Sequence, residues 1–204
     1  MGKDGKAVSA APARFLASRD YIDELRAILD RLDHAMVDRF TEAIWRGYEQ
    51  GKTLFIFGNG GSAALASHLA TDIGKGTIAG ARARLRVIAL TDNVPLMTAW
   101  ANDSGYEHIF SEQLRGLVQR GDLAFAISGS GNSKNVVLGL EAAREAGATA
   151  MVLTGFDGGR VKELCELCLV VPSHNMQHVE DAHLCAAHAI FTAVRERMMR
   201  PSGE

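Results

Sequence analysis

The stretch LAFAISGSGNS, residues 123–133, joins a short apolar run to a turn rich in glycine and hydroxyl groups. The apolar run, Leu123 to Ile127, has the length of a buried strand, and residues 135–146 after the turn have a helix-like pattern. Glycines let the backbone approach an anion closely, and the first turn of a helix offers unpaired N–H groups and the positive end of its dipole. The stretch therefore predicts a strand, a phosphate-binding turn and a helix, in that order.

The composition of this turn narrows the class of ligand. The P-loop of nucleotide hydrolases ends in Gly-Lys-Ser or Gly-Lys-Thr, and no lysine interrupts residues 128–133. Serine hydroxyls and backbone amides are neutral donors. The turn therefore favours a phosphorylated small molecule over a nucleoside triphosphate.

Similar apolar runs recur along the chain and are separated by helix-like segments. They lie at residues 53–57, 86–90, 123–127, 149–153 and 167–171. This alternation predicts an α/β protein with three layers, in which helices cover both faces of a doubly wound five-stranded parallel sheet. Two amphipathic helices, 13–32 and 35–49, are expected before the first strand, and a last helix is expected over about 179–198 and to end by Pro201. We expect residues 1–12 to be a disordered tail and residues 13–204 to form one domain.

The overall charge and the cysteines exclude several classes of function. The 204 residues include 22 Lys and Arg against 24 Asp and Glu, a net charge of −2 that disfavours broad binding to nucleic acid. No apolar run is long enough to span a membrane, and the first residues lack the apolar core of a signal peptide, so we expect a cytoplasmic protein.

Cys165 and Cys168 form a CxxC motif, which on one interpretation is half of a zinc site or a redox pair. We favour the other, in which they are small apolar residues where a helix meets a strand.

A second glycine-serine turn, FGNGGS at residues 57–62, resembles the first. It brings Asn59, Gly60 and Ser62 to the end of another predicted strand. Ligands of open α/β sheets bind beyond the carboxyl ends of the strands, and Thr154-Gly155 also lies at that edge. The two turns are therefore expected to face one ligand.

Two predicted helices carry groups suited to acid–base or metal chemistry. His68 and Asp72 are four residues apart, which puts them on one helix face. Glu180 and His188 are eight residues apart on the last helix and also share a face. One interpretation is that these four side chains converge as acid–base groups or as ligands of zinc or a similar ion. The other is that they are surface pairs or buried core histidines.

These motifs together resemble the SIS (sugar isomerase) domain family, and the phosphoheptose isomerase branch is the most similar. The resemblance runs from about Ala13 to the last helix. It rests on the motifs 58-GNGGS-62, His68-x-x-x-Asp72, 102-ND-x-G-105, 128-S-x-SGNS-133, 153-LTG-x-DGG-159 and the late His188.

The resemblance implies an activity and a set of substrate contacts. It implies aldose–ketose isomerisation of a phosphorylated sugar, sedoheptulose 7-phosphate, to D-glycero-D-manno-heptose 7-phosphate through an enediol. Asp72 would be the base, and His188 would move protons at the oxygens. The implied substrate contacts are Asn59, Gly60, Ser62, Asp103, Ser128, Gly129, Ser130, Ser133 and Glu180.

The resemblance also implies a cofactor and an assembly. One zinc ion per subunit would be held by His68, Asp72, Glu180 and His188, and would polarise a carbonyl. The protein would form a homotetramer with its sites near subunit interfaces, without membrane or direct nucleic-acid partners.

Four positions depart from the family pattern and leave alternatives open. Asp72 stands where Glu is usual, Glu180 where Gln is usual, Gly129 where Thr is frequent, and Gln177 where the family has Asp. A base displaced by about an ångström can lose on the order of 10²-fold in rate. One alternative is an isomerase of another sugar phosphate. Another is a non-catalytic tetramer that binds the replication initiator protein, although members of that branch tend to lose the acid–base pair.

Overall fold

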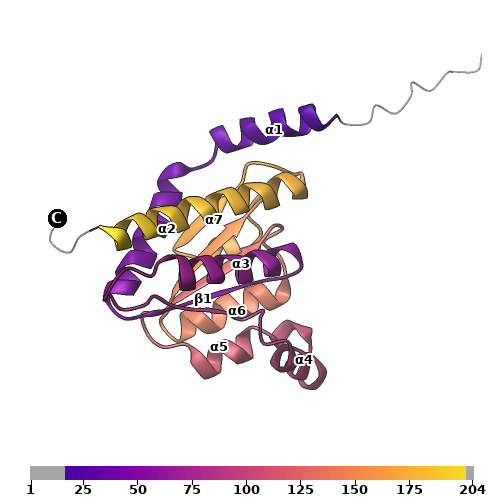
Figure 1. Ribbon diagram of the computed structural model, residues 1–204. Helices are drawn as coiled ribbons and strands as arrows, with labels where there is room; N and C mark the ends of the chain where they lie inside the picture. Colours follow the sequence, from indigo (N-terminus) through magenta and orange to yellow (C-terminus); the bar gives the residue numbers. More distant parts are fainter. Residues whose placement is uncertain (1–16, 201–204) are drawn as a thin grey trace, which may run out of the picture.

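Apolar side chains at nearly every position of the central strands bury both faces of a parallel sheet. All residues of β1 (Thr53–Gly58) and β3 (Leu123–Ser128) are buried. The computed structural model, which describes residues 17–200, pairs them with β2 (Arg86–Ala89), β4 (Thr149–Thr154) and β5 (Leu167–Val170). The order is β2-β1-β3-β4-β5, and every pair is parallel (Figure 1). The predicted doubly wound α/β class and its five strands are confirmed.

Two helices precede the first strand, as predicted, and helical segments then separate each strand from the next within the described range. The α-helices are α1 Ser18–Asp30, α2 His34–Glu49, α3 Gly61–Gly76, α4 Val94–Asp103, α5 Ser111–Leu117, α6 Lys134–Glu145 and α7 Met176–Met199. Two short 3-10 helices are η1 Tyr106–His108 and η2 Arg160–Glu163. None of the helices within residues 17–200 combines the length and apolar character that a membrane span needs.

The alternation of side chains along the strands divides the core into two layers. Leu54 and Ile56 of β1 pack with α2, α3 and α7, whereas Phe55 and Phe57 pack with α5 and α6 on the opposite face. Period-two alternation within continuously apolar strands explains why both faces need helices. Figure 1 shows α3 and α7 on one side of the sheet and α5 and α6 on the other.

Two helix boundaries within the described residues differ from the predicted ones by two residues or more, the end of α1 and the start of α7. The predicted tail (1–12), the first residues of the predicted first helix and Pro201 lie outside the described residues. Within the described range α1 already ends at Asp30. The last helix begins at Met176 and not at Val179, because the Asn175 side chain accepts a hydrogen bond from the Gln177 N–H and caps the helix there.

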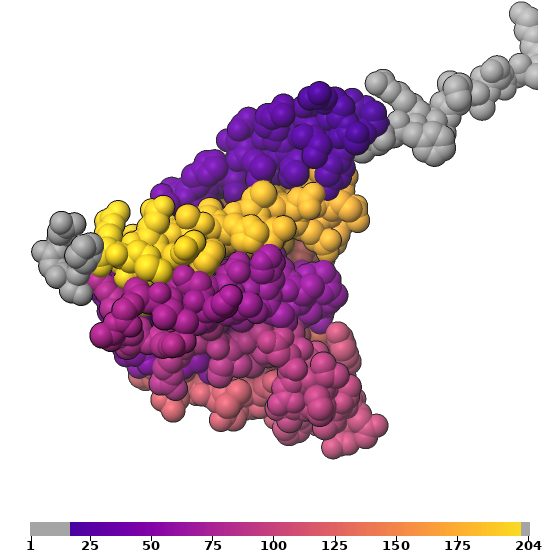
Figure 2. All heavy atoms as spheres, in the orientation of Figure 1, coloured from indigo at the N-terminus to yellow at the C-terminus, as the bar shows by residue number. Residues whose placement is uncertain are grey.

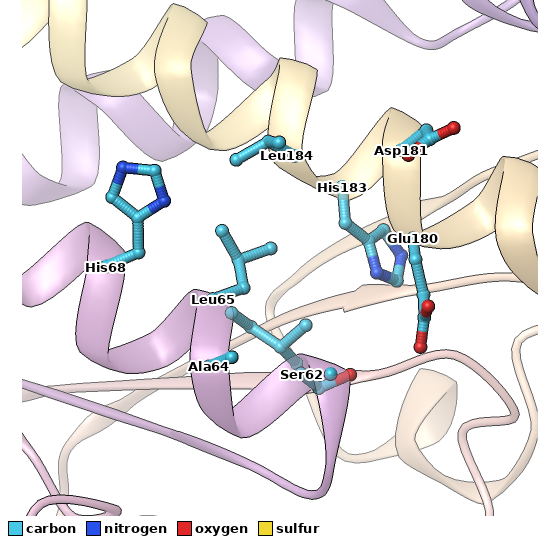
Figure 3. Close-up of a pocket in the computed structure, with 10 residues that line it drawn as sticks. Ser62, Ala64, Leu65, His68, Glu180, Asp181, His183 and Leu184 are labelled. Carbon is cyan, nitrogen blue, oxygen red and sulfur yellow. The ribbon is translucent and has the colours of Figure 1, made fainter.

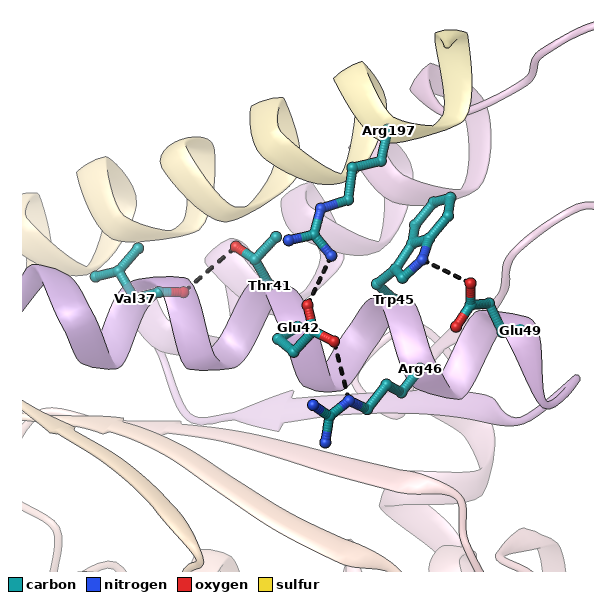
Figure 4. Close-up of polar contacts among 7 residues, drawn as sticks. All are labelled: Val37, Thr41, Glu42, Trp45, Arg46, Glu49 and Arg197. Atoms are coloured by element: carbon teal, nitrogen blue, oxygen red, sulfur yellow. Dashed lines mark hydrogen bonds and ion pairs between the residues drawn. The ribbon is translucent and has the colours of Figure 1, made fainter. Parts of the chain in front are cut away.

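Polar contacts outside the core fasten α7 to α2 (Figure 4). The Arg197 guanidinium donates to Glu42 Oε2 at 2.8 Å, and the Arg46 Nε donates to Glu42 Oε1 at 2.9 Å. These bonds lower the pKa of Glu42. Arg197 also lies 5.9 Å from the centre of the Trp45 ring. The C-terminal half of α7 is thus fixed on the N-terminal helices, which orients its other end toward the carboxyl ends of the strands.

Truncation of a central core side chain should test this packing. Phe125 on β3 is fully buried, and its ring lies 5.1 Å from that of Phe40 on α2. We expect Phe125→Ala to lower the free energy of unfolding by about 3–5 kcal/mol, because it removes contacts and leaves a cavity. Leu117→Ala, at a site in α5 that is 47% exposed, should change it by less than about 0.5 kcal/mol. Urea unfolding at fixed protein concentration measures both, and equal effects would contradict the assignment of the core.

Candidate active site

The two glycine-serine turns meet where the strand order reverses, between β1 and β3. Helix α3 leaves β1 on one face of the sheet and α6 leaves β3 on the other, so a crevice opens between the turns. A pocket of about 260 Å³ occupies this crevice. Its walls are Asn59, Gly60, Gly61, Ser62, Ile127, Ser128, Gly129, Ser130, Ser133, Met176 and Glu180. The structure therefore brings eight of the nine predicted substrate contacts into one pocket.

The turn at 128–133 holds its shape through close backbone contacts. Gly131 has φ +65°, and a Cβ there would lie 2.1 Å from the Gly158 carbonyl oxygen, so only glycine fits. The Ser130 hydroxyl accepts from the Asn132 N–H at 3.3 Å. Ser133 directly precedes α6, whose first N–H groups have no partner within the helix. Serine hydroxyls and a helix N-terminus thus surround one end of the pocket, which suits a phosphate group.

A groove between α3 and α7 continues from this pocket (Figure 3). It encloses about 270 Å³ and shares Gly61, Ser62, Ile127 and Glu180 with the first pocket. Ala64, Leu65 and His68 of α3 and Asp181, His183 and Leu184 of α7 line the remainder. Together the two spaces form one elongated site with hydroxyls at one end and an imidazole at the other.

His68, Asp72 and His188 come together beyond the groove. The Asp72 Oδ2 atom lies 3.4 Å from His68 Nε2 and 3.7 Å from His188 Nε2. The two imidazole rings are 5.1 Å apart, edge to face. One ligand atom from each residue lies within 4.8 Å of the others. The shorter side chain of Asp72 therefore still reaches both histidines.

This trio fits a first-row divalent ion. Two imidazoles and a carboxylate are the donors that zinc prefers, and catalytic zinc sites use three protein ligands and leave one position open. The His68 and His188 side chains are about half exposed, at 49% and 48%, so an ion could enter from solvent. The structure thus brings three of the four residues of the first interpretation to one point, and it leaves out Glu180.

Glu180, the fourth residue of the predicted metal set, stands apart from the trio. It is not part of the group whose ligand atoms lie within 4.8 Å. Its carboxylate lies against the start of α3, where a Cβ on Gly61 would be 2.9 Å from Glu180 Oε1. A carboxylate at a helix N-terminus is favoured by the helix dipole. In this structure Glu180 faces the middle of the elongated site.

His183 adds a buried, neutral imidazole to the wall of the groove. Its Nε2 atom is 3.1 Å from the Thr154 carbonyl oxygen, which can only accept, so Nε2 carries the proton. Burial lowers the pKa of His183 to about 4. The Nδ1 atom is buried and has no partner among the described residues. His183 is therefore an uncharged wall residue that helps to fasten α7 to the end of β4.

Asp103 is the predicted substrate contact that the pocket lacks. It ends α4, is exposed, and accepts from the neighbouring Asn102 side chain at 2.8 Å. Figure 2 shows α4 protruding from the body of the molecule. Conversely, no local sequence pattern indicated Met176, whose sulfur lies 2.5 Å from where a Gly129 Cβ would be. Met176 thus fills the space that a larger residue at position 129 would take.

The CxxC cysteines lie away from the site. Cys168 is in β5, and both thiols pack against the core layer that faces α5 and α6. Burial raises the pKa of both thiols. A thiol held protonated in this way is a poor nucleophile and a poor metal ligand, which agrees with the packing role that we favoured.

Known proteins resemble this chain in sequence and in structure. The family model for the SIS domain matches residues 20–155. A phosphoheptose isomerase of Rhodospirillum rubrum is 43% identical over 148 residues, 72% of this chain and 78% of that protein. One of Aquifex aeolicus is 38% identical over 154 residues, 76% of this chain and 80% of that protein. The solved phosphoheptose isomerase of Neisseria gonorrhoeae superposes with a TM-score of 0.81 at 28% identity, over 87% of this chain and 96% of that chain.

Zinc binding should depend on the trio. We expect His68→Gln to weaken zinc binding by at least about 100-fold, because loss of even an outer-shell partner typically costs 10–100-fold. His34→Gln, at an exposed position that begins α2, should leave the affinity unchanged. Competition with a chromophoric chelator measures both constants. Equal affinities of the His68→Gln variant and the unaltered protein would show that the trio is not the zinc site.

Proposed function

Because the chain belongs to the phosphoheptose isomerase family of SIS-domain proteins, we propose that it is an aldose–ketose isomerase of sedoheptulose 7-phosphate. The product would be D-glycero-D-manno-heptose 7-phosphate, formed through an enediol. The observation that carries this proposal is the elongated site, with a phosphate-binding turn at one end and the His68–Asp72–His188 trio at the other.

The length of the site favours a long sugar chain. Ser62 lines the phosphate end and Asp72 the reactive end of the same helix, ten residues apart, which corresponds to about 15 Å along the axis. A short sugar phosphate anchored at residues 128–133 would place its carbonyl farther from Asp72 than a heptose would. The apolar floor of Ala64, Leu65 and Leu184 suits the carbon backbone between these ends.

Different residues would bind the phosphate, remove the proton from carbon and transfer protons between the oxygens. Ser128, Ser130, Ser133 and the first N–H groups of α6 bind the phosphate, and they fix the position of the rest of the ligand. Asp72 removes the proton from the carbon next to the carbonyl. His188, beside Asp72 at 3.7 Å, moves protons between the two sugar oxygens.

His68, Asp72 and His188 would hold a zinc ion, and Glu180 would contact sugar hydroxyls or complete the metal set. When bound, zinc supplies Lewis-acid polarisation of a carbonyl oxygen. Asp103, which is exposed and does not line the pocket of its own chain, would contact the ligand of a neighbouring subunit in a homotetramer. Exposed Ile88 of β2 and exposed Val94 at the start of α4, the helix that Asp103 ends, support an interface there. The free thiols of Cys165, Cys168 and Cys185 support a reducing, cytoplasmic location.

Two alternative functions can be distinguished from the proposed one by assays of turnover and binding. An isomerase of another sugar phosphate is favoured by Gly129 and Met176, which reshape the phosphate end of the pocket. A panel of pentose, hexose and heptose phosphates separates it from the heptose enzyme. A non-catalytic protein that binds the replication initiator is disfavoured by the close approach of Asp72 and His188. Capture of the initiator protein in the absence of any turnover would favour it.

Turnover should depend on the Asp72 carboxylate. With zinc and sedoheptulose 7-phosphate, we expect product by NMR from the unaltered protein and none above background from Asp72→Asn, which keeps the shape but cannot take a proton. Asp38→Asn, exposed on α2, should behave like the unaltered protein. No turnover by the unaltered protein with any of several divalent metals would contradict the proposed activity. Turnover by Asp72→Asn would contradict the role of this residue.

Loss of a phosphate contact should affect binding more than chemistry. We expect Ser130→Ala to raise KM about tenfold or more, because a hydrogen bond to a charged group contributes about 1.5–3 kcal/mol. Its kcat should change little, since the phosphate is remote from the reacting carbons. Ser18→Ala, at an exposed position in α1, is the matched control. A Ser130→Ala variant with normal KM would remove this hydroxyl from the phosphate site.

A further inference from the structure

The amide of Asn59 is locked against a second amide across the crevice. Asn59 Nδ2 donates to Asn135 Oδ1 at 2.8 Å, and Asn135 Nδ2 donates to Asn59 Oδ1, also at 2.8 Å. Asn59 lies in the turn after β1 and lines the phosphate pocket, whereas Asn135 is the second residue of α6 and is only 3% exposed. This reciprocal pair joins the two walls of the pocket.

A third residue, Tyr106 of η1, completes the contacts of Asn59. Its hydroxyl donates to Asn59 Oδ1 at 3.0 Å, although the ring itself is 57% exposed. An amide oxygen has two lone pairs, and Tyr106 and Asn135 occupy both. An amide nitrogen has two hydrogens, and Asn135 accepts one. Among the described residues, these bonds leave Asn59 with one N–H for a ligand and no acceptor.

The residue after Tyr106 ties the same 3-10 helix to the other wall of the pocket. Glu107 Oε1 lies 2.9 Å from the Lys134 ammonium, and Lys134 is the first residue of α6. The hydrogen bond from Lys134 lowers the pKa of Glu107. An exposed ion pair of this kind adds little stability. It does keep η1 over the rim of the pocket, so that Tyr106 stays within reach of Asn59.

We propose that Tyr106 and Asn135 are positioning residues that orient the Asn59 amide as a hydrogen-bond donor to the ligand. An unrestrained amide can turn over and present its carbonyl oxygen, which would repel a phosphoryl oxygen. With Oδ1 occupied twice, the orientation is set before the ligand arrives, and no binding energy is used to reorient it. The identity of the ligand, a sugar phosphate, rests on the proposed function.

Tyr106→Phe tests this orientation because it removes one hydroxyl from an exposed ring and should leave the fold intact. Tyr48→Phe, which removes a hydroxyl from α2 away from the site, is the matched control. Binding of sedoheptulose 7-phosphate and of inorganic phosphate would be measured by calorimetry in the Asp72→Asn background, where turnover is blocked. KM and kcat would be measured in the active protein.

We expect Tyr106→Phe to weaken sedoheptulose 7-phosphate binding about three- to tenfold, the range for one neutral hydrogen bond. KM should rise by a similar factor while kcat stays within about twofold, and Tyr48→Phe should have no effect. Weaker binding of inorganic phosphate as well would show that the Asn59 N–H serves the phosphoryl group. An effect on the sugar phosphate alone would assign the N–H to a sugar oxygen. Either result supports the proposal.

Other outcomes overturn it. Unchanged binding of both probes by Tyr106→Phe would show that Tyr106 does not position Asn59. A fall in kcat equal to the fall in kcat/KM would give Tyr106 a role in the transition state instead. If the unaltered protein shows no turnover but Tyr106→Phe still weakens binding of the probes, the result would contradict the proposed function and support the positioning role. Failure of the Asp72→Asn protein to bind either probe would overturn both.

Discussion

In the β1–β3 pair, Gly58 lies opposite Ile127, and the two glycine-serine turns follow directly. A Cβ on Gly58 would be 2.6 Å from the Ile127 carbonyl oxygen and 2.8 Å from Ser62 Cβ, so the strand end and the first turn of α3 approach as closely as the backbone allows. The chain leaves these neighbouring strands toward opposite faces of the sheet. The crevice between the turns is a consequence of that pairing, and the pocket that we propose binds the phosphate occupies it.

The reactive end of the site depends on a second contact, between α3 and α7. Both helices cover the same face of the sheet, because α7 returns over it after β5. Their contact brings His188 to Asp72 and His68, and it creates the groove that leads back to the glycine-serine turns. The bond from His183 to Thr154 holds α7 beside this groove, and the bond from Arg197 to Glu42 holds it near its C-terminal end. The packing of α7 thus aligns the groups that would bind the ligand with those that would react with it.

Local sequence patterns predicted the strands and the shared helix faces. They did not predict the contacts between residues that lie far apart in the chain. The apolar runs predicted all five strands because a buried parallel strand needs apolar residues on both faces. The i,i+4 spacing of His68 and Asp72 predicted their shared face because helix geometry fixes it. No spacing signals that Asn135 pairs with Asn59 or that Tyr106 reaches the same amide, since these bonds span 76 and 47 positions of the chain. The capped start of α7 at Asn175 was missed because the helical pattern of apolar residues begins after the cap.

The sequence by itself determined the fold class, the glycine-serine turn between β3 and α6 and the kinds of side chain available for chemistry, because glycine conformations, apolar periodicity and side-chain chemistry are local properties. The tertiary structure decided which of these groups meet. It joined His188 to His68 and Asp72, kept Glu180 at the start of α3, and left Asp103 exposed and outside the pocket of its own chain. Such proximities depend on how distant helices pack on a shared sheet, and only the folded chain specifies that packing.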